Sequence, residues 1–251
     1  PIEGVKVYIQ NGEESVYTDY SGSYILSLPE GTYDVSAELN GYESGLAEDQ
    51  KVAAGQKSTR DFTLISTEDN PKVTFAESFV EERVRSALGK PVGDMTKEDM
   101  LRLTNLSLYR ASNLAGLQYA KNLDSLTLDR DSYYNEKITD FTIISNFSKL
   151  TYLKITNSNL ENISFLSNLT NLNSLELNRN NISDLSPLSS LTNLTNLHLY
   201  QNNISDLSPL STLVNLKTLE LGYNKIKNLA GLEPLTKLTY LYLYENQIED
   251  I

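Results

Sequence analysis

The sequence predicts a β-rich chain of the α+β class: a small β-sandwich, then a helical cap, then a solenoid of repeats with a parallel β-sheet on its concave face. Three observations support this fold class. Residues 1–65 alternate between apolar and polar side chains, as half-buried strands do. Residues 73–105 carry apolar side chains at helical spacing. From residue 106 onward, a leucine pattern recurs with a period of 22 residues, which indicates stacked structural repeats.

The first domain is expected over residues 1–65. Strands are predicted around residues 5–9, 24–28, 33–39 and 62–64, where apolar side chains occupy every second position. Turn signals such as Asn11-Gly12 and Asn40-Gly41 separate these runs. Short strands at such intervals favour a small β-sandwich. Residues 66–72 are expected to form a short linker.

A helical cap is expected over residues 73–105, because an exposed solenoid end needs a cover. Phe79, Val80 and Val84 recur at helical spacing, and Gly89 is expected to end that helix. Thr96, with an acidic residue three positions later, predicts a capping box at the start of a second helix.

The repeats occupy residues 106–251. The first leucines of the L-x-L pairs are separated by 20, 27, 22, 22, 22 and 22 residues, and they are Leu106, Leu126, Leu153, Leu175, Leu197, Leu219 and Leu241. The surrounding text matches the L-x-x-L-x-L-x-x-N pattern of leucine-rich repeats. The longer interval predicts a loop near residues 132–137. Because the chain stops inside a repeat, the repeat array is expected to be truncated at its C-terminus.

An asparagine follows the first leucine of each pair by five residues. An inward-facing asparagine at that place can satisfy backbone groups of the turn after the strand. The predicted ladder comprises Asn180, Asn202, Asn224 and Asn246. Ser158 replaces asparagine in one repeat, which predicts a weaker rung there. Prolines in the returning segments favour short 3₁₀ turns over long helices.

Composition excludes several functions. The chain has no cysteine and one histidine, so it has no thiolate zinc site, disulfide or multi-histidine metal site. A formal net charge of −12 argues against nucleic-acid binding. No apolar run is long enough to span a membrane. No catalytic motif is found, so we expect no catalytic residues, no metal and no cofactor.

Strand alternation places three rows of side chains on the concave sheet. Tyrosines gather toward the C-terminal end of these rows, and exposed tyrosines are typical of interfaces. Gly222 is expected to leave a dip among them that admits a partner side chain. The structural alternative is that tyrosine simply suits exposed strands. The predicted partner-binding residues are Tyr152, Glu176, His198, Tyr200, Glu220, Tyr223, Tyr240, Tyr242 and Tyr244.

His198 lies between Glu176 and Glu220 in one of these rows. Three interpretations remain open: a charged ladder that keeps the sheet soluble, a pH-sensitive contact with a partner, and a metal site of two carboxylates and one imidazole. The first is favoured, and the metal site is the least favoured, since nothing else in the sequence supplies the surrounding groups that would orient the metal ligands.

Two resemblances add to this interpretation. The text TDYSGSYILSLPEGTYDVSAELNGYES resembles the carboxypeptidase regulatory-like, transthyretin-like domain, which implies a structural or spacer module. The NxIxDLxPLxxLTNL repeat and the cap segment GKPVGDMTKEDM resemble the internalin family of Gram-positive surface proteins. That resemblance covers about residues 73–251. It implies an extracellular protein, on the cell surface or associated with the cell wall, that binds another macromolecule.

The sequence therefore predicts a non-catalytic recognition or adhesion module that binds a protein ligand through its concave face. One alternative is a glycan- or substrate-targeting region of a larger secreted enzyme, since tyrosines also suit sugars. Another is a structural stalk. Neither nucleic acid nor a membrane span is expected in this chain.

Overall fold

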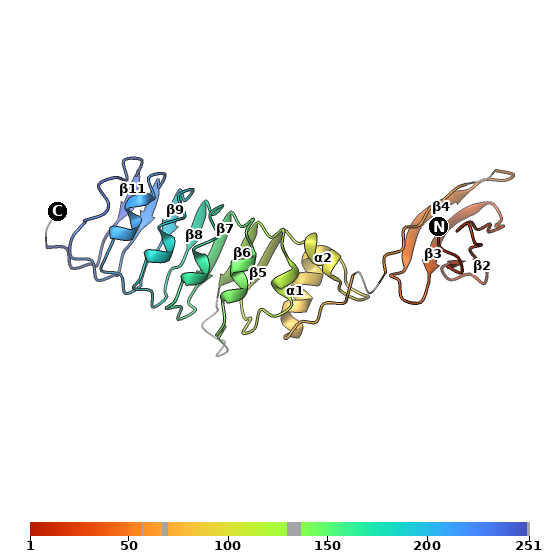
Figure 1. The fold of residues 1–251 in the computed structure, drawn as a ribbon, viewed down its shortest axis with the longest axis horizontal. Helices are drawn as coiled ribbons and strands as arrows, with labels where there is room; N and C mark the ends of the chain where they lie inside the picture. Colours follow the sequence, from red (N-terminus) through yellow and green to blue (C-terminus); the bar gives the residue numbers. More distant parts are fainter. Residues whose placement is uncertain (57, 67–69, 130–136, 250–251) are drawn as a thin grey trace. The chain divides into compact units, whose positions relative to one another are not determined.

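A computed structural model describes residues 1–56, 58–66, 70–129 and 137–249. The chain forms two compact units, Pro1–Lys72 and Val73–Ile251 (Figure 1). The loop predicted near residues 132–137 falls almost entirely outside the described residues.

The first unit contains one antiparallel sheet. Its strands are β1 (Lys6–Ile9), β2 (Ser15–Tyr17), β3 (Gly31–Glu38) and β4 (Gly45–Val52), in the order β2-β1-β3-β4. The β3–β4 pairing shifts register between Tyr33 and Val35, which marks a β-bulge.

Two segments cover the inner face of this sheet. Residues 24–28 and 62–64 contribute apolar side chains that pack against buried Val7, Val35 and Ala37. Neither segment is a strand of the sheet, so the prediction of strands there was wrong. Conversely, β2 and β4 were not predicted, because β2 has only three residues and polar residues dominate β4. The apolar alternation in residues 24–28 and 62–64 therefore indicates that one face of each segment is buried against the sheet, and it does not indicate that their backbones pair with a neighbouring strand.

The second unit begins with two helices, α1 (Ser78–Leu88) and α2 (Lys97–Leu101). The inner face of α1 buries Phe79, Val80 and Val84, and the helix ends at Gly89. The Thr96 side chain accepts a hydrogen bond from the Asp99 amide, and the Asp99 carboxylate accepts one from the Thr96 amide. The predicted capping box is therefore confirmed.

A parallel sheet of seven strands runs along the repeats, with neighbouring strands in sequence order. The strands are β5 (Asn105–Leu108), β6 (Ser125–Asp129), β7 (Tyr152–Thr156), β8 (Ser174–Glu176), β9 (Asn196–His198), β10 (Thr218–Glu220) and β11 (Tyr240–Tyr242). The first leucines of the L-x-L pairs lie opposite one another in every pairing, from Leu106 to Leu241. The repeat spacing in the sequence therefore gives the strand register.

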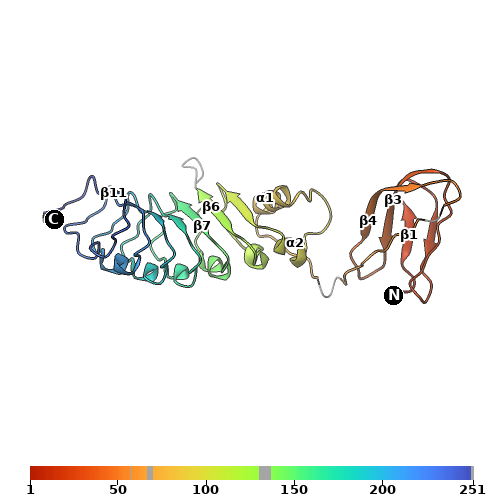
Figure 2. The same cartoon turned by 90° about the horizontal axis from the view of Figure 1, so that it is seen from above.

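Short 3₁₀ helices lie on the opposite side of the repeats from the sheet (Figure 2). They are η1 (Leu117–Tyr119), η2 (Thr142–Asn146), η3 (Ser164–Leu166), η4 (Ser186–Leu188) and η5 (Ser208–Thr212). A proline stands in the first turn of η4 and of η5, where a missing amide hydrogen costs no helical bond. The leucines between the sheet and these helices form one continuous buried cluster.

The inward asparagines connect successive repeats. The Asn202 amide group donates to the carbonyls of Leu177 and Leu199 at 3.0 and 3.1 Å, and its oxygen accepts from the Ile182 amide at 3.0 Å. Asn180, Asn224 and Asn246 make the same kinds of contact. The Ser158 hydroxyl, at the equivalent place, donates to the Thr156 carbonyl of its own repeat at 2.9 Å, and the Ser158 amide donates to the Asn180 side chain at 3.0 Å.

Candidate functional site

The sheet face is defined here as the outward side chains of β5–β11 together with the residues where those strands end. In the last five repeats, the chain leaves each strand through a residue with positive φ: Asn157, Arg179, Gln201, Tyr223 and Glu245. This left-handed turn is unusual for residues other than glycine and asparagine. It recurs at the same place in each repeat, so these side chains form an additional row along the edge of the sheet face, which we call the strand-exit row.

A charged network occupies the middle of the sheet face. The Lys154 ammonium lies 2.9 Å from an Asp129 carboxylate oxygen, and the Thr156 hydroxyl donates to the other oxygen. Partial burial by itself raises the pKa of Asp129, but the hydrogen bonds from Thr156 and Lys154 outweigh it and hold the pKa below its usual value. Asp129 therefore stays ionised and fixes the position of Lys154.

Tyr152 and Glu176 form the next pair along the face. The Tyr152 hydroxyl donates to a Glu176 carboxylate oxygen at 2.8 Å. Partial burial of the ring, together with this bond and the charge of Glu176, raises the pKa of Tyr152 to about 12. The bond holds the tyrosine ring across two adjacent strands.

His198 pairs with only one of its two neighbouring carboxylates. Its Nδ1 lies 2.9 Å from a Glu220 oxygen, whereas Glu176 is engaged by Tyr152. In the part of the chain that the structure describes, no group of three or more histidine, aspartate or glutamate side chains is arranged to hold a metal ion. The Tyr152–Glu176 contact therefore joins β7 and β8, and the His198–Glu220 contact joins β9 and β10.

Three tyrosines pack together beyond these two contacts, and we call Tyr200, Tyr223 and Tyr244 the tyrosine cluster. The ring centres of Tyr200 and Tyr223 are 5.3 Å apart, and those of Tyr223 and Tyr244 are 5.7 Å apart, both in edge-to-face geometry. Tyr200 and Tyr244 are 6.2 Å apart. Edge-to-face packing is favourable for aromatic rings, so the cluster is held in place before any partner arrives.

Gly222 does not leave the dip that the sequence predicted. A Cβ atom at this position would stand only 2.7 Å from the Tyr244 ring. The ring of Tyr244 therefore lies over the glycine and fills the space above it. The space left by the missing side chain of Gly222 is therefore occupied by Tyr244 of this chain and not by a side chain of a partner.

The remaining predicted tyrosines lie on the last described strand. Tyr240 and Tyr242 on β11 are 59% and 46% exposed, and Tyr223 and Tyr244 of the cluster are 46% and 49% exposed. Tyr200 is half-buried beneath them. The structure thus places the predicted residues in three neighbouring groups: the Tyr152–Glu176 pair, the His198–Glu220 pair, and the tyrosines of the last repeats.

Sequence reasoning missed several contacts around these groups. The Arg179 guanidinium lies 5.9 Å from the centre of the Tyr200 ring, and the Asn178 side chain accepts a hydrogen bond from the Tyr200 amide at 2.8 Å. At the other end of the sheet, the Arg110 guanidinium lies 4.3 Å from the centre of the Phe79 ring. Arg110 follows Leu106 by four residues, as Arg179 follows Leu175, and this shared position of two arginines in the repeat was the sequence signal for both cation–π contacts.

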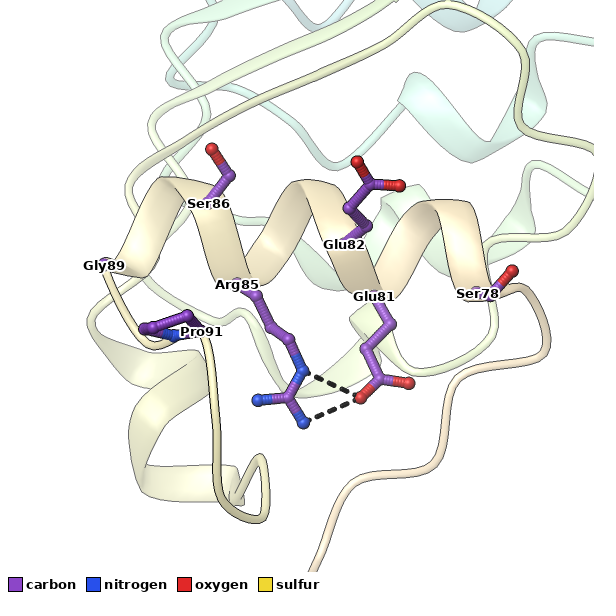
Figure 3. Close-up of a pocket in the computed structure, with 7 residues that line it drawn as sticks. All are labelled: Ser78, Glu81, Glu82, Arg85, Ser86, Gly89 and Pro91. Carbon is purple, nitrogen blue, oxygen red and sulfur yellow. Dashed lines mark hydrogen bonds and ion pairs between the residues drawn. The ribbon is translucent and has the colours of Figure 1, made fainter.

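A depression on the outer side of α1 does not form a second site. Its lining includes Glu81, Glu82, Arg85 and Ser86 (Figure 3). Arg85 is paired with Glu81 at 2.8 Å, and in Figure 3 this pair points away from Glu82 and Ser86. The polar groups therefore do not converge on a common ligand position.

Comparisons with known proteins agree with this architecture. Residues 1–65 match the carboxypeptidase regulatory-like domain. Residues 170–212, 192–234 and 214–251 match the family described as leucine rich repeats (2 copies). No curated protein matched the chain.

Solved structures of internalins are similar to this chain. An internalin (inlF) from Listeria monocytogenes is 33% identical with a TM-score of 0.58, over 70% of this chain and 58% of that one. The chain thus spans less than two thirds of that protein's solved length. An internalin C2 from the same organism is 29% identical with a TM-score of 0.58, over 72% of this chain and 92% of that one. A leucine-rich repeat protein of Leptospira interrogans, 23% identical with a TM-score of 0.51, covers 62% of this chain and 46% of its own, and shares the fold.

The fold and these matches define the class: a leucine-rich repeat protein. More particularly, it is an internalin-like leucine-rich repeat protein with an N-terminal carboxypeptidase regulatory-like domain. Among the described helices, none combines the length and the apolar character that crossing a membrane requires.

Proposed function

We propose that this chain is a non-catalytic recognition module on the surface of a Gram-positive bacterium and binds a protein partner through its sheet face, in adhesion or contact with another cell. The likeness to Listeria internalins supports the bacterial and extracellular setting. The sheet face is an open surface, and the single histidine of the chain is paired with Glu220.

One observation carries the proposal. Tyr223 and Tyr244 pack edge to face at 5.7 Å and yet remain 46% and 49% exposed. Tyrosines that served only the stability of the sheet would gain more by burial in the core. Exposed rings that hold one another in place provide a large contact area and lose little conformational entropy when a partner binds.

Binding of the purified chain to intact candidate partner cells tests the proposal. The triple variant Tyr223→Ser, Tyr242→Ser, Tyr244→Ser is compared with the wild type and with a control variant, Tyr17→Ser. Tyr17 is 64% exposed but lies in the first unit. We expect the triple variant to bind at least about tenfold more weakly, because the loss of one hot-spot tyrosine costs about 2 kcal/mol and about 1.4 kcal/mol corresponds to a factor of ten. The control should bind like the wild type.

Treatment of the cells separates the protein ligand from a glycan. Digestion of surface proteins with trypsin should abolish binding, whereas removal of surface glycans should leave it intact. Equal binding by the triple variant and the wild type, with both proteins folded, would overturn the proposal. Loss of binding only after glycan removal would favour the glycan-targeting alternative.

A further inference from the structure

The surroundings of the tyrosine cluster carry more negative than positive charge. Glu220 lies on β10 beside Tyr242 of β11, and Glu245 stands in the strand-exit row next to Tyr223. Partial burial and the negative charge of Glu220 together raise the pKa of the Tyr244 phenol, so this carboxylate acts on the ring. The basic side chains beside these groups are Arg179, which lies 5.9 Å from the Tyr200 ring centre, and His198, whose Nδ1 lies 2.9 Å from a Glu220 oxygen.

Two aromatic rings of this chain already form cation–π contacts with arginine side chains. Arg179 lies 5.9 Å from the ring centre of Tyr200, and Arg110 lies 4.3 Å from that of Phe79. A planar guanidinium stacks on aromatic faces and is attracted by their negative charge distribution. Arg179 contacts Tyr200, which is the most buried ring of the cluster, whereas Tyr223 and Tyr244 are both exposed.

Resting on the function proposed above, we propose that the tyrosine cluster with Glu220 and Glu245 receives an arginine side chain of the protein partner. The guanidinium lies against the exposed rings of Tyr223 and Tyr244. The Glu245 carboxylate and the Glu220 carboxylate, one oxygen of which also contacts His198 Nδ1 at 2.9 Å, supply the opposite charge. This arrangement combines a cation–π contact with ion pairing, which together discriminate against neutral and acidic groups.

Other occupants fit the same surface less well. An acidic side chain would be repelled by Glu220 and Glu245. A sugar would stack on the tyrosines but would gain nothing from the carboxylates through charge. The overall net charge of −12 likewise favours approach of a basic partner over an acidic one.

A titration with a small probe tests the assignment without an identified partner. The probe is N-acetyl-arginine methylamide, and the matched neutral probe is the citrulline derivative, which has nearly the same shape. Tyrosine ring signals are followed by NMR in the whole chain. Tyr17 in the first unit serves as the reference ring.

We expect the arginine probe to shift the ring signals of Tyr223 and Tyr244 and to leave Tyr17 unchanged. An exposed cation–π contact predicts that the citrulline probe binds about two- to fivefold more weakly. The double variant Glu220→Gln, Glu245→Gln should weaken arginine binding by a further factor of about two to five. The control variant Glu13→Gln, on an exposed loop of the first unit, should have no effect.

Equal shifts from both probes, or no shift at Tyr223 and Tyr244, would overturn the arginine assignment. That result together with tyrosine-dependent binding to cells would leave the proposed function standing. If the chain prefers the arginine probe but binds no cells, the proposed function is contradicted and the arginine assignment is not. The two ideas therefore fail in different experiments.

Discussion

Replacing Asn202 by alanine tests how the repeats are held together. The Asn202 side chain is 8% exposed and contacts four backbone groups from two repeats, of which the bond to the Tyr200 carbonyl is the longest at 3.4 Å. The carbonyl of Leu177 also accepts from Asn180, and that of Leu199 also accepts from Asn224, so each keeps one partner in the variant. The amide of Ile182 loses its partner.

The expected cost follows from this inventory. A buried amide without a partner costs about 1–3 kcal/mol, and each of the two shorter carbonyl bonds that are lost contributes about 0.5–1.5 kcal/mol. We therefore expect Asn202→Ala to lower the free energy of unfolding by about 2–6 kcal/mol. Asn202→Asp should be equally harmful, because a carboxylate cannot donate to the two carbonyls.

Urea unfolding followed by circular dichroism measures this cost, and Asn193→Ala provides the matched control. The Asn193 side chain also bonds to a carbonyl of the preceding repeat, at 2.9 Å, but at an exposed position. We expect the control to cost less than about 1 kcal/mol. Hydrogen exchange should speed up at the Ile182 amide in Asn202→Ala. Equal losses in Asn202→Ala and Asn193→Ala would refute the reasoning.

Three further predictions follow from single contacts. Gly222→Ala should displace the Tyr244 ring, seen by NMR, at a cost in stability below about 1 kcal/mol, because an exposed side chain can move. Leu197→Ala should cost about 2–5 kcal/mol by urea unfolding, since Leu197 is fully buried. Ultraviolet titration should give Tyr152 a pKa of about 12, and Glu176→Gln should lower it. Because folding raises this pKa above 10.0, the corresponding stability is present below that pH and is lost as the pH rises toward 12.

A marked loss of stability is expected only where these contacts are buried. A small effect of Leu197→Ala would contradict the continuous core, and a Tyr152 that titrates at its ordinary pKa would contradict the bond to Glu176. Leu241 provides the comparison for Leu197, since it occupies the same register but is 40% exposed. Leu241→Ala should therefore cost less than half as much.

The sequence predicted the solenoid well because its period is a direct consequence of stacking. Leu175, Leu197 and Leu219 lie in register and are fully buried, as the 22-residue spacing required. The returning segments are 3₁₀ helices, which the placement of Pro187 and Pro209 had indicated. The register of the leucines and the 3₁₀ helices at the prolines each depend on residues within one repeat or its neighbour, so they can be predicted from the sequence of this chain alone.

The first unit was harder to predict, because strand pairing depends on distant residues. Alternation in residues 24–28 correctly indicated a buried face, but it contains no information on whether a neighbouring backbone is available. The polar strand β4 shows the converse: its pairing with β3 depends on backbone hydrogen bonds more than on burial.

The sequence predicted where the residues of the candidate site lie on the sheet but not which of their side chains contact one another. The repeat placed Tyr200, Tyr223 and Tyr244 at one end of the sheet, yet it gave no hint that their rings pack together. It also predicted a dip at Gly222 that the Tyr244 ring fills. Side-chain rotamers decide both outcomes, and rotamers depend on neighbours from adjacent repeats.

Chemical labelling of tyrosines, read by mass spectrometry with the chain free and bound to cells, tests most directly whether the sheet face is the binding surface. All the tyrosines compared are exposed in the free chain. We expect binding to protect Tyr223, Tyr242 and Tyr244 from labelling and to leave Tyr17 and Tyr20 in the first unit unchanged. Protection of Tyr17 and Tyr20, with the sheet-face tyrosines labelled as in the free chain, would contradict the assignment of the sheet face as the binding surface.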